Sequence, residues 1–358
     1  GSMAEAVAYA NGLSGERAYI QLLSDVETDT ITFTQGTTTL DLNGNTLISR
    51  NFNRVITLND GILTIADSSK DKNGTISSDS DKSTRTEGII CVSGGSLVVE
   101  NGTIIRDNQN ANESAINFSS GNVIINGGKV VSKRSNYGIT ISSQGTVTVN
   151  GGSVENNDDG WAIVNSGTLI INGGEVIAKL RDTINNGGTL NMTGGKVYNV
   201  STSGYEWHAI NNISNATISG GEVMGRYGIR ALKGTLTVDG GTITSTDGHA
   251  IVVTSNSTIR VNNGHITANK SAIFIDGNAT GSIEVTGGLV ESIGYTSAIH
   301  HLGTGKLTIG GNAVITATGE NEGYSYSTVA VYYDTSFEIN GGTIENKSTI
   351  PTSTAIYV

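Results

Sequence analysis

The octapeptide LIINGGEV, residues 169–176, decides how this chain folds. In an extended strand Leu169 and Ile171 point to one face and Ile170 points to the other. After Asn172 two glycines follow, and the apolar pattern then resumes. The arrangement recurs as VIINGGKV at 123–130, VTVNGGSV at 147–154, LTVDGGTI at 236–243 and FEINGGTI at 337–344. Such self-similarity predicts a chain of stacked repeats.

The second glycine of each pair, or its equivalent, marks the phase of the repeat. The markers are Gly44, Gly74, Gly102, Gly128, Gly152, Gly174, Gly195, Gly221, Gly241, Gly264, Gly288, Gly311 and Gly342. A small residue followed by Ile lies between them, as at Ala162-Ile163. Each repeat then contains three short strands: one with the small-Ile pair, one before the glycines and one after them. Glycine permits the positive φ angles of tight corners, so we predict an all-β parallel solenoid of about 13 coils.

This repeat resembles the right-handed parallel β-helix of the pectate-lyase-like superfamily. It is most similar to the glycine-rich, INGG-repeating segments of large bacterial surface proteins, and the resemblance covers residues 30–358. The resemblance implies an extracellular protein, surface-displayed or secreted by a bacterium. This fold carries lyases, hydrolases, adhesins and tailspikes, so it does not determine the activity.

The ends of the chain differ from the repeats. Residues 1–3 are expected to be an expression scar, and residues 4–29 an N-terminal cap with a short helix over 4–11 that covers the open edge of the first coil. Residues 30–358 are expected to form a single β-helix domain. Because the chain stops within a strand at 354–358, we expect a C-terminal truncation and further domains of a larger surface protein as partners.

Composition excludes several classes of partner. The net charge of −11 works against nucleic acid, and no stretch approaches the ~20 apolar residues of a membrane span.

Cys91 is the only cysteine, so an intrachain disulfide is impossible. Five scattered histidines offer no ligand spacing, and the Asp-rich segment 67–83 lacks the order of a calcium loop, so it should form solvated loops. We expect no metal and no cofactor.

Two stripes of side chains follow from the stacking, because equivalent positions of successive coils become neighbours. The residue two positions after the marker Ile should face inward. In three consecutive coils it is asparagine, which predicts a structural ladder of stacked amides formed by Asn165, Asn186 and Asn212.

The residue two positions before the marker Ile gives the second stripe, which is rich in aromatic, acidic and imidazole side chains. An insertion at 202–207 adds more aromatic residues, and residues 129–233 carry nine basic and seven acidic groups, a net charge of +2. The candidate ligand-binding residues are Tyr137, Trp161, Asp182, Tyr205, Trp207, His208, Tyr227 and His249. Aromatic faces beside hydrogen-bonding groups suit sugar rings, whereas an aromatic stack that covers a corner would use the same residues.

Catalytic motifs are weak. Polygalacturonases of this fold carry N-T-D, G-H-G and R-I-K motifs; here N-T-D and R-I-K are absent and His249 lies in DGHA. We therefore expect a non-catalytic, adhesin-like module that binds a polysaccharide, a host glycan or a glycoprotein along one side of the β-helix. Two alternatives remain: a polysaccharide lyase or glycoside hydrolase that uses Asp182, Arg181 and His208, and a structural stalk.

Overall fold

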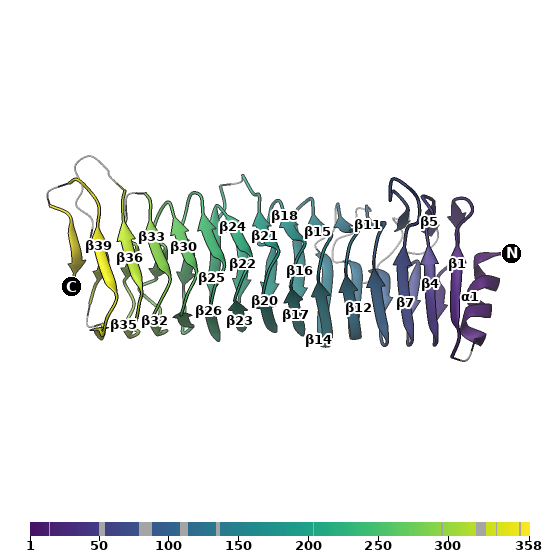
Figure 1. Cartoon of the computed structure of the whole chain (residues 1–358), viewed down its shortest axis with the longest axis horizontal. Helices are drawn as coiled ribbons and strands as arrows, with labels where there is room; N and C mark the ends of the chain where they lie inside the picture. The colour runs from purple at the N-terminus through teal and green to yellow at the C-terminus, as the bar shows by residue number, and fades with distance from the viewer. Residues whose placement is uncertain are drawn as a thin grey trace. The chain divides into compact units, whose positions relative to one another are not determined.

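The computed structural model describes residues 1–13, 15–49, 54–78, 88–107, 114–133, 137–202, 204–294, 296–319, 327–333, 335–350 and 352–358, without the side chains of 140–143. The chain is an all-β parallel β-solenoid of about 13 turns with a single short helix in this described part, as the repeat predicted (Figure 1). It divides into two compact units, Gly1–Thr183 and Ile184–Val358, which we call unit 1 and unit 2.

Unit 1 begins with helix α1 (Met3–Gly12) and continues with three rows of strands. The strands before the glycines are β1 (Arg17–Gln21), β4 (Thr37–Asp41), β7 (Ile62–Ala66), β10 (Ser96–Val99) and β17 (Thr168–Ile171). The strands after the glycines are β2 (Val26–Glu27), β5 (Thr46–Ser49), β8 (Thr75–Ser78), β11 (Thr103–Arg106), β13 (Lys129–Ser132), β15 (Ser153–Asn156) and β18 (Glu175–Ala178). The third row holds β3 (Ile31–Phe33), β6 (Ile56–Leu58), β9 (Gly88–Val92) and β16 (Trp161–Asn165); the long strands β12 (Ser114–Ile125) and β14 (Tyr137–Val149) run through the third row into the first.

Unit 2 repeats the same three rows. The strands that carry the marker Ile or its equivalent are β19 (Ile184–Asn186), β22 (His208–Asn212), β25 (Tyr227–Ala231), β28 (Ile251–Val253), β31 (Ile273–Ile275), β34 (Ile299–His301), β37 (Ser327–Val331) and β40 (Thr354–Tyr357). The strands before the glycines are β20 (Thr189–Met192), β23 (Asn215–Ile218), β26 (Thr235–Val238), β29 (Thr258–Val261), β32 (Ile283–Val285), β35 (Leu307–Ile309) and β38 (Phe337–Ile339). Those after them are β21 (Lys196–Asn199), β24 (Glu222–Gly225), β27 (Thr242–Ser245), β30 (His265–Ala268), β33 (Leu289–Ser292), β36 (Val314–Ala317) and β39 (Thr343–Asn346).

Strands of successive coils pair in parallel with equivalent residues side by side. Strand β14 places Val147 beside Leu169 and Val149 beside Ile171 of β17, and all four side chains are fully buried. The alternation seen in the sequence therefore fills the interior of each coil with stacked aliphatic residues.

Each glycine of the pair meets a different steric requirement. The second has a positive φ angle, 66° at Gly152 and 70° at Gly174, a region that L-residues with a side chain rarely adopt. The first has no such angle, but a Cβ at Gly151 would lie 2.4 Å from the backbone oxygen of Asn126 in the preceding coil. The corner that the sequence predicted thus needs one glycine for its turn and another for the close approach of two backbones.

The polar residue before the glycines links coils along the exposed corner. The Asn150 side-chain amide donates to Oδ1 of Asn126 across 2.9 Å, and Asn172 donates in the same way to Asn150 across 2.9 Å. Asn126 in turn donates to Oε1 of Glu100, 2.8 Å away. The asparagine of the NGG motif therefore forms an outer ladder of side-chain hydrogen bonds.

Helix α1 covers the first coil of unit 1, as expected of the N-terminal cap (Figure 1). It starts with a capping box: the Ser2 hydroxyl accepts from the backbone N–H of Glu5 (3.2 Å), and the Glu5 carboxylate accepts from that of Ser2 (2.7 Å). Met3, Val7 and Ala10 are the buried residues of the helix. Its apolar face thus shields the interior of the first coil from water.

Most of residues 68–73 are exposed, as expected of a solvated loop, but Asp67, where the Asp-rich segment starts, is buried. Asp67 is only 1% exposed, and its carboxylate accepts hydrogen bonds from the backbone N–H groups of Gly44 (2.9 Å), Ser69 (3.0 Å) and Gly74 (2.5 Å). These bonds lower the pKa of Asp67 against the opposing effect of its burial, which raises it. Asp67 therefore fixes a loop through backbone donors. Residues 79–83 lie outside the described part of the chain.

Candidate functional site

The predicted inward asparagines are buried in both units. Asn165 of unit 1 is 1% exposed, and its Oδ1 accepts from the backbone N–H of Gly167 at 3.0 Å. In unit 2, Asn186 donates to Oδ1 of Asn212 at 2.7 Å and to the backbone oxygen of Asn215 at 3.0 Å. The Asn186 and Asn212 amides thus bond to each other, and Asn165 bonds to nearby backbone, as polar groups in a protein interior require.

The predicted ligand-binding residues fall into two groups. Tyr137, Trp161 and Asp182 belong to unit 1, and Tyr205, Trp207, His208, Tyr227 and His249 belong to unit 2.

In unit 1, Trp161 forms the centre of a stack. Its ring lies parallel to that of Tyr137, with 5.5 Å between centroids and 5° between planes. The guanidinium carbon of Arg181 lies 5.0 Å from the Trp161 ring centroid. Because Tyr137 and Arg181 come from the coils before and after Trp161, they cover the two faces of the indole ring. A sugar ring has therefore only the edge of this stack to contact.

Arg181 is also held in place by a carboxylate. Its Nε donates to Oδ1 of Asp159 across 2.6 Å, and this bond raises the pKa of Arg181. The neighbouring Asp182 is only 7% exposed. These contacts are those of an aromatic and cationic stack at a corner of the coil, so the binding role of Tyr137, Trp161 and Asp182 stays a prediction.

In unit 2 the insertion presents aromatic rings to solvent. It lies between the end of β21 and the start of β22 and carries Tyr205, which is 72% exposed. The ring of Trp207 is half-buried and lies 5.8 Å from that of Tyr205 at an angle of 43°. The backbone N–H of Trp207 donates to the Tyr205 carbonyl oxygen at 3.0 Å, which fixes the turn between them. The pair thus offers aromatic surface to solvent, most of it from Tyr205.

A shallow hollow of about 240 Å³ lies at the residues that directly precede this insertion in the chain. It is lined by Asn199, Val200, Ser201, Met224, Gly225, Arg226 and Thr246. Val200 is 51% exposed, and Arg226 Nε donates to Oδ2 of Asp247 across 3.0 Å. This bond raises the pKa of Arg226 and keeps its guanidinium charged at the rim. The hollow therefore combines apolar side chains with amide, hydroxyl and guanidinium groups, which is the mixture that sugar recognition uses.

His208 and Tyr227 are buried residues next to the insertion, and Tyr227 bonds to it. They are 4% and 8% exposed, and their rings lie 5.4 Å apart at 49°. The Tyr227 hydroxyl donates to Oε1 of Glu206 in the insertion at 3.3 Å. Burial, and then the Glu206 charge, raises the pKa of Tyr227, so its hydroxyl stays protonated as a donor. Because both side chains are buried and Tyr227 bonds to Glu206, a role in positioning the insertion suits them better than ligand contact.

His249 belongs to a second row of rings, which we call the aromatic ladder of unit 2. Its members are His249, Phe274, His300, Tyr332 and Tyr357, with successive ring centroids 4.4, 5.7, 5.3 and 5.3 Å apart. Sequence reasoning found only His249. Three other members, Phe274, His300 and Tyr357, directly follow a marker Ile, and this pattern could have been recognised. Because the rings cover one another, the ladder presents edges rather than faces.

Two groups of the enzymatic alternative are poorly accessible, whereas the side chain of the third, Arg181, is 33% exposed. Asp182 is 7% exposed in unit 1 and His208 is 4% exposed in unit 2. A general acid or base must come within hydrogen-bond distance of a substrate proton.

Within the described residues, no three His, Cys, Asp or Glu side chains gather as a metal site would need. No helix in this part of the chain has the length and apolar character to cross a membrane.

Comparison of the chain with protein-family models, with curated proteins and with solved structures gave no match.

Proposed function

We propose that this chain is a non-catalytic binding module of a bacterial surface or secreted protein, and that its ligand is a polysaccharide, a host glycan or a glycoprotein. The observation that carries the proposal is the pair of exposed Tyr205 and half-buried Trp207 on an insertion whose preceding residues, Val200 and Ser201, line the hollow. Aromatic rings next to a charged or amide donor match the apolar faces and hydroxyl groups of a sugar.

The resemblance to the pectate-lyase-like superfamily, and to INGG-repeating segments of bacterial surface proteins, supports the extracellular, adhesin-like setting of the proposal. Within that superfamily the competing function is cleavage of the same kind of ligand. The low exposure of Asp182 and His208 supports binding over cleavage, because a catalytic group must come within hydrogen-bond distance of its substrate.

The test is a glycan array that spans plant, host and microbial sugars, probed with the whole chain and followed by product analysis on every hit. We expect binding without cleavage, weakened at least about tenfold in Tyr205→Ala and in Trp207→Ala, since a lost anchor ring is worth about 1.4 kcal/mol or more. Tyr333→Ala is the matched control, because Tyr333 is 78% exposed and lies outside the site.

Two results would contradict the proposal. New reducing ends or unsaturated products that disappear in Asp182→Asn would indicate the lyase or hydrolase. The absence of both binding and cleavage across the array would favour the structural stalk.

A further inference from the structure

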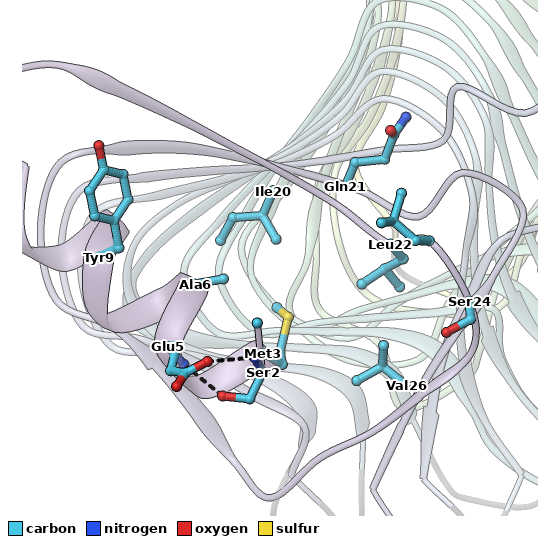
Figure 2. A pocket seen from close by; sticks show the side chains of 12 residues that line it. Ser2, Met3, Glu5, Ala6, Tyr9, Ile20, Gln21, Leu22, Ser24 and Val26 are labelled. Atoms are coloured by element: carbon cyan, nitrogen blue, oxygen red, sulfur yellow. Dashed lines mark hydrogen bonds between the residues drawn. The ribbon is translucent and has the colours of Figure 1, made fainter.

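A groove runs along one side of helix α1 in unit 1 (Figure 2). It consists of two adjoining hollows of about 490 and 360 Å³. Both are lined by Ala6 and Tyr9 of the helix and by Ile20 and Gln21 of strand β1. The groove therefore follows β1 along its length, with the helix as the opposite wall.

The backbone of β1 has an open hydrogen-bonding edge toward this groove. Strand β1 pairs with β4 on one side, and the N–H of Leu22 donates to the Asp41 oxygen at 2.9 Å. Backbone groups of alternate residues in a strand point to opposite edges. Those of Arg17, Tyr19 and Gln21 consequently point away from β4, toward the side of the groove.

The neighbouring strand shows how the chain satisfies such an edge when it covers one. Asn11, near the end of α1, donates its side-chain amide to the Thr32 oxygen of β3 at 2.8 Å. Its Oδ1 accepts from the N–H of Thr34 at 3.0 Å. Asn11 thus takes the place of a paired strand at β3, and no described side chain does this for the outer edge of β1.

The groove has the chemistry of a strand acceptor. An open strand edge pairs with extended peptide, and a parallel sheet favours a parallel addition. Leu23, which is 86% exposed, and Tyr9, which is 70% exposed, add apolar surface at the groove. The charged side chains that line the groove are Glu5, Glu16 and Arg17, a net side-chain charge of −1, and residues 1–29 as a whole carry −4, so the charge complement is a cationic partner.

We propose that the groove between α1 and β1 binds an extended, basic peptide whose alternate residues are apolar, and that this peptide adds to β1 as a parallel strand. This site lies in unit 1 and does not depend on the glycan site of unit 2. The apolar residues of the peptide contact Ala6, Tyr9 and Ile20, and its backbone pairs with the outer edge of β1.

The experiment uses the whole chain and two labelled eight-residue peptides, one of alternating Val and Lys and one of alternating Val and Glu. Binding is followed by fluorescence anisotropy and by amide hydrogen exchange. We expect the Val-Lys peptide to bind at least tenfold more tightly. It should slow exchange at Tyr19 and Gln21 at least fivefold and leave Ile20 and Leu22, which already face β4, nearly unchanged.

Arg17→Pro provides the decisive variant. It removes one outer-edge N–H at the first position of the strand, where proline is tolerated, while Arg17→Ala removes the same side chain and keeps the N–H. We expect Arg17→Pro to bind at least fivefold more weakly than Arg17→Ala. If Arg17→Pro does not fold, the exchange pattern of the unmodified chain decides.

Equal binding of the two peptides, or slowed exchange that does not follow the alternation along β1, would overturn the proposal. Protection of Tyr19 and Gln21 that rises with protein concentration in the absence of peptide would assign the edge to a second copy of the chain, and would overturn it as well.

Discussion

The side-chain amide of Asn186 donates a hydrogen bond of 2.7 Å to the side-chain oxygen of Asn212, and both residues are completely buried in unit 2. Replacing Asn186 with Leu would leave Asn212 and the backbone oxygen of Asn215 without this partner. We expect the free energy of unfolding to fall by about 1–3 kcal/mol. Urea denaturation followed by circular dichroism measures this change.

The control for that substitution is Asn172→Leu, which breaks an amide hydrogen bond of the exposed outer ladder. Water replaces that bond at little cost, so the change should stay within about 0.5 kcal/mol. Equal effects of the two substitutions would show that burial of the amide does not decide its contribution.

Gly151→Ala tests the close approach of successive coils. Its added Cβ would lie 2.4 Å from the Asn126 oxygen, so the backbone must shift. We expect a loss of about 1–3 kcal/mol, the usual cost of forced overpacking. The matched variant Gly204→Ala, where no atom lies within 4 Å of the added Cβ, should melt like the unmodified chain.

Stability should depend on pH through buried histidines of unit 2. Burial lowers the pKa of His249 to about 4, with a further contribution from Lys270, and burial also lowers the pKa values of His300 and His301. An unfolded His, with a pKa near 6.5, binds a proton that the folded one refuses. The contribution of each neutral, buried histidine to the free energy of unfolding is therefore fully present above about pH 6.5, and it is lost as pH falls below that value.

For His249 alone this loss is about 2 kcal/mol at pH 5. Melting temperatures between pH 7 and pH 5 test it, in a window above the usual pKa of carboxylates. His249→Phe keeps a ring next to Phe274 and cannot take up the proton, so its melting temperature should fall less. An equal fall in both proteins would contradict the assignment.

Arg181→Lys should destabilise unit 1 by about 0.5–1 kcal/mol although the charge is kept. A lysine keeps a point charge near Asp159 but loses the planar contact with Trp161 and the directed Nε hydrogen bond. A double-mutant cycle with Trp161→Phe should show coupling between the two positions. Additive effects would mean that the stacking contributes nothing measurable.

The solenoid, its corners and its buried rows were predictable because each follows from short-range periodicity. Leu169 and Ile171 are buried and alternate with Ile170, which lies on the outer face of the coil. Gly174 adopts the positive φ angle that a tight corner requires. The need for glycine at Gly173 was not predictable in the same way. It arises from the Asn150 oxygen of the preceding coil, a contact that depends on the distance between two backbones.

The candidate site was less predictable because equal phase in the repeat does not give equal surroundings. Trp161 is covered on both faces by residues of adjacent coils, whereas Tyr205 is exposed on an inserted loop. Sequence reasoning also missed Tyr332, whose ring joins the aromatic ladder although it does not directly follow a marker residue. Only the lateral packing of side chains decides which aromatic residues meet.

Residue-for-residue pairing between coils has a consequence for how this chain can change over generations. Thr235–Val238 pairs residue for residue with Thr258–Val261, and Ile259–Val261 pairs in the same way with Ile283–Val285. Each coil therefore presents to the next coil nearly the same strand edge that the previous coil presents to it. Unequal crossover that inserts or deletes a whole repeat would therefore leave both new seams in register, whereas loss of a single residue would shift every inward side chain of a strand to the outer face. The gene should tolerate gains and losses in units of one coil, and length variants of the protein should differ by multiples of roughly 25 residues.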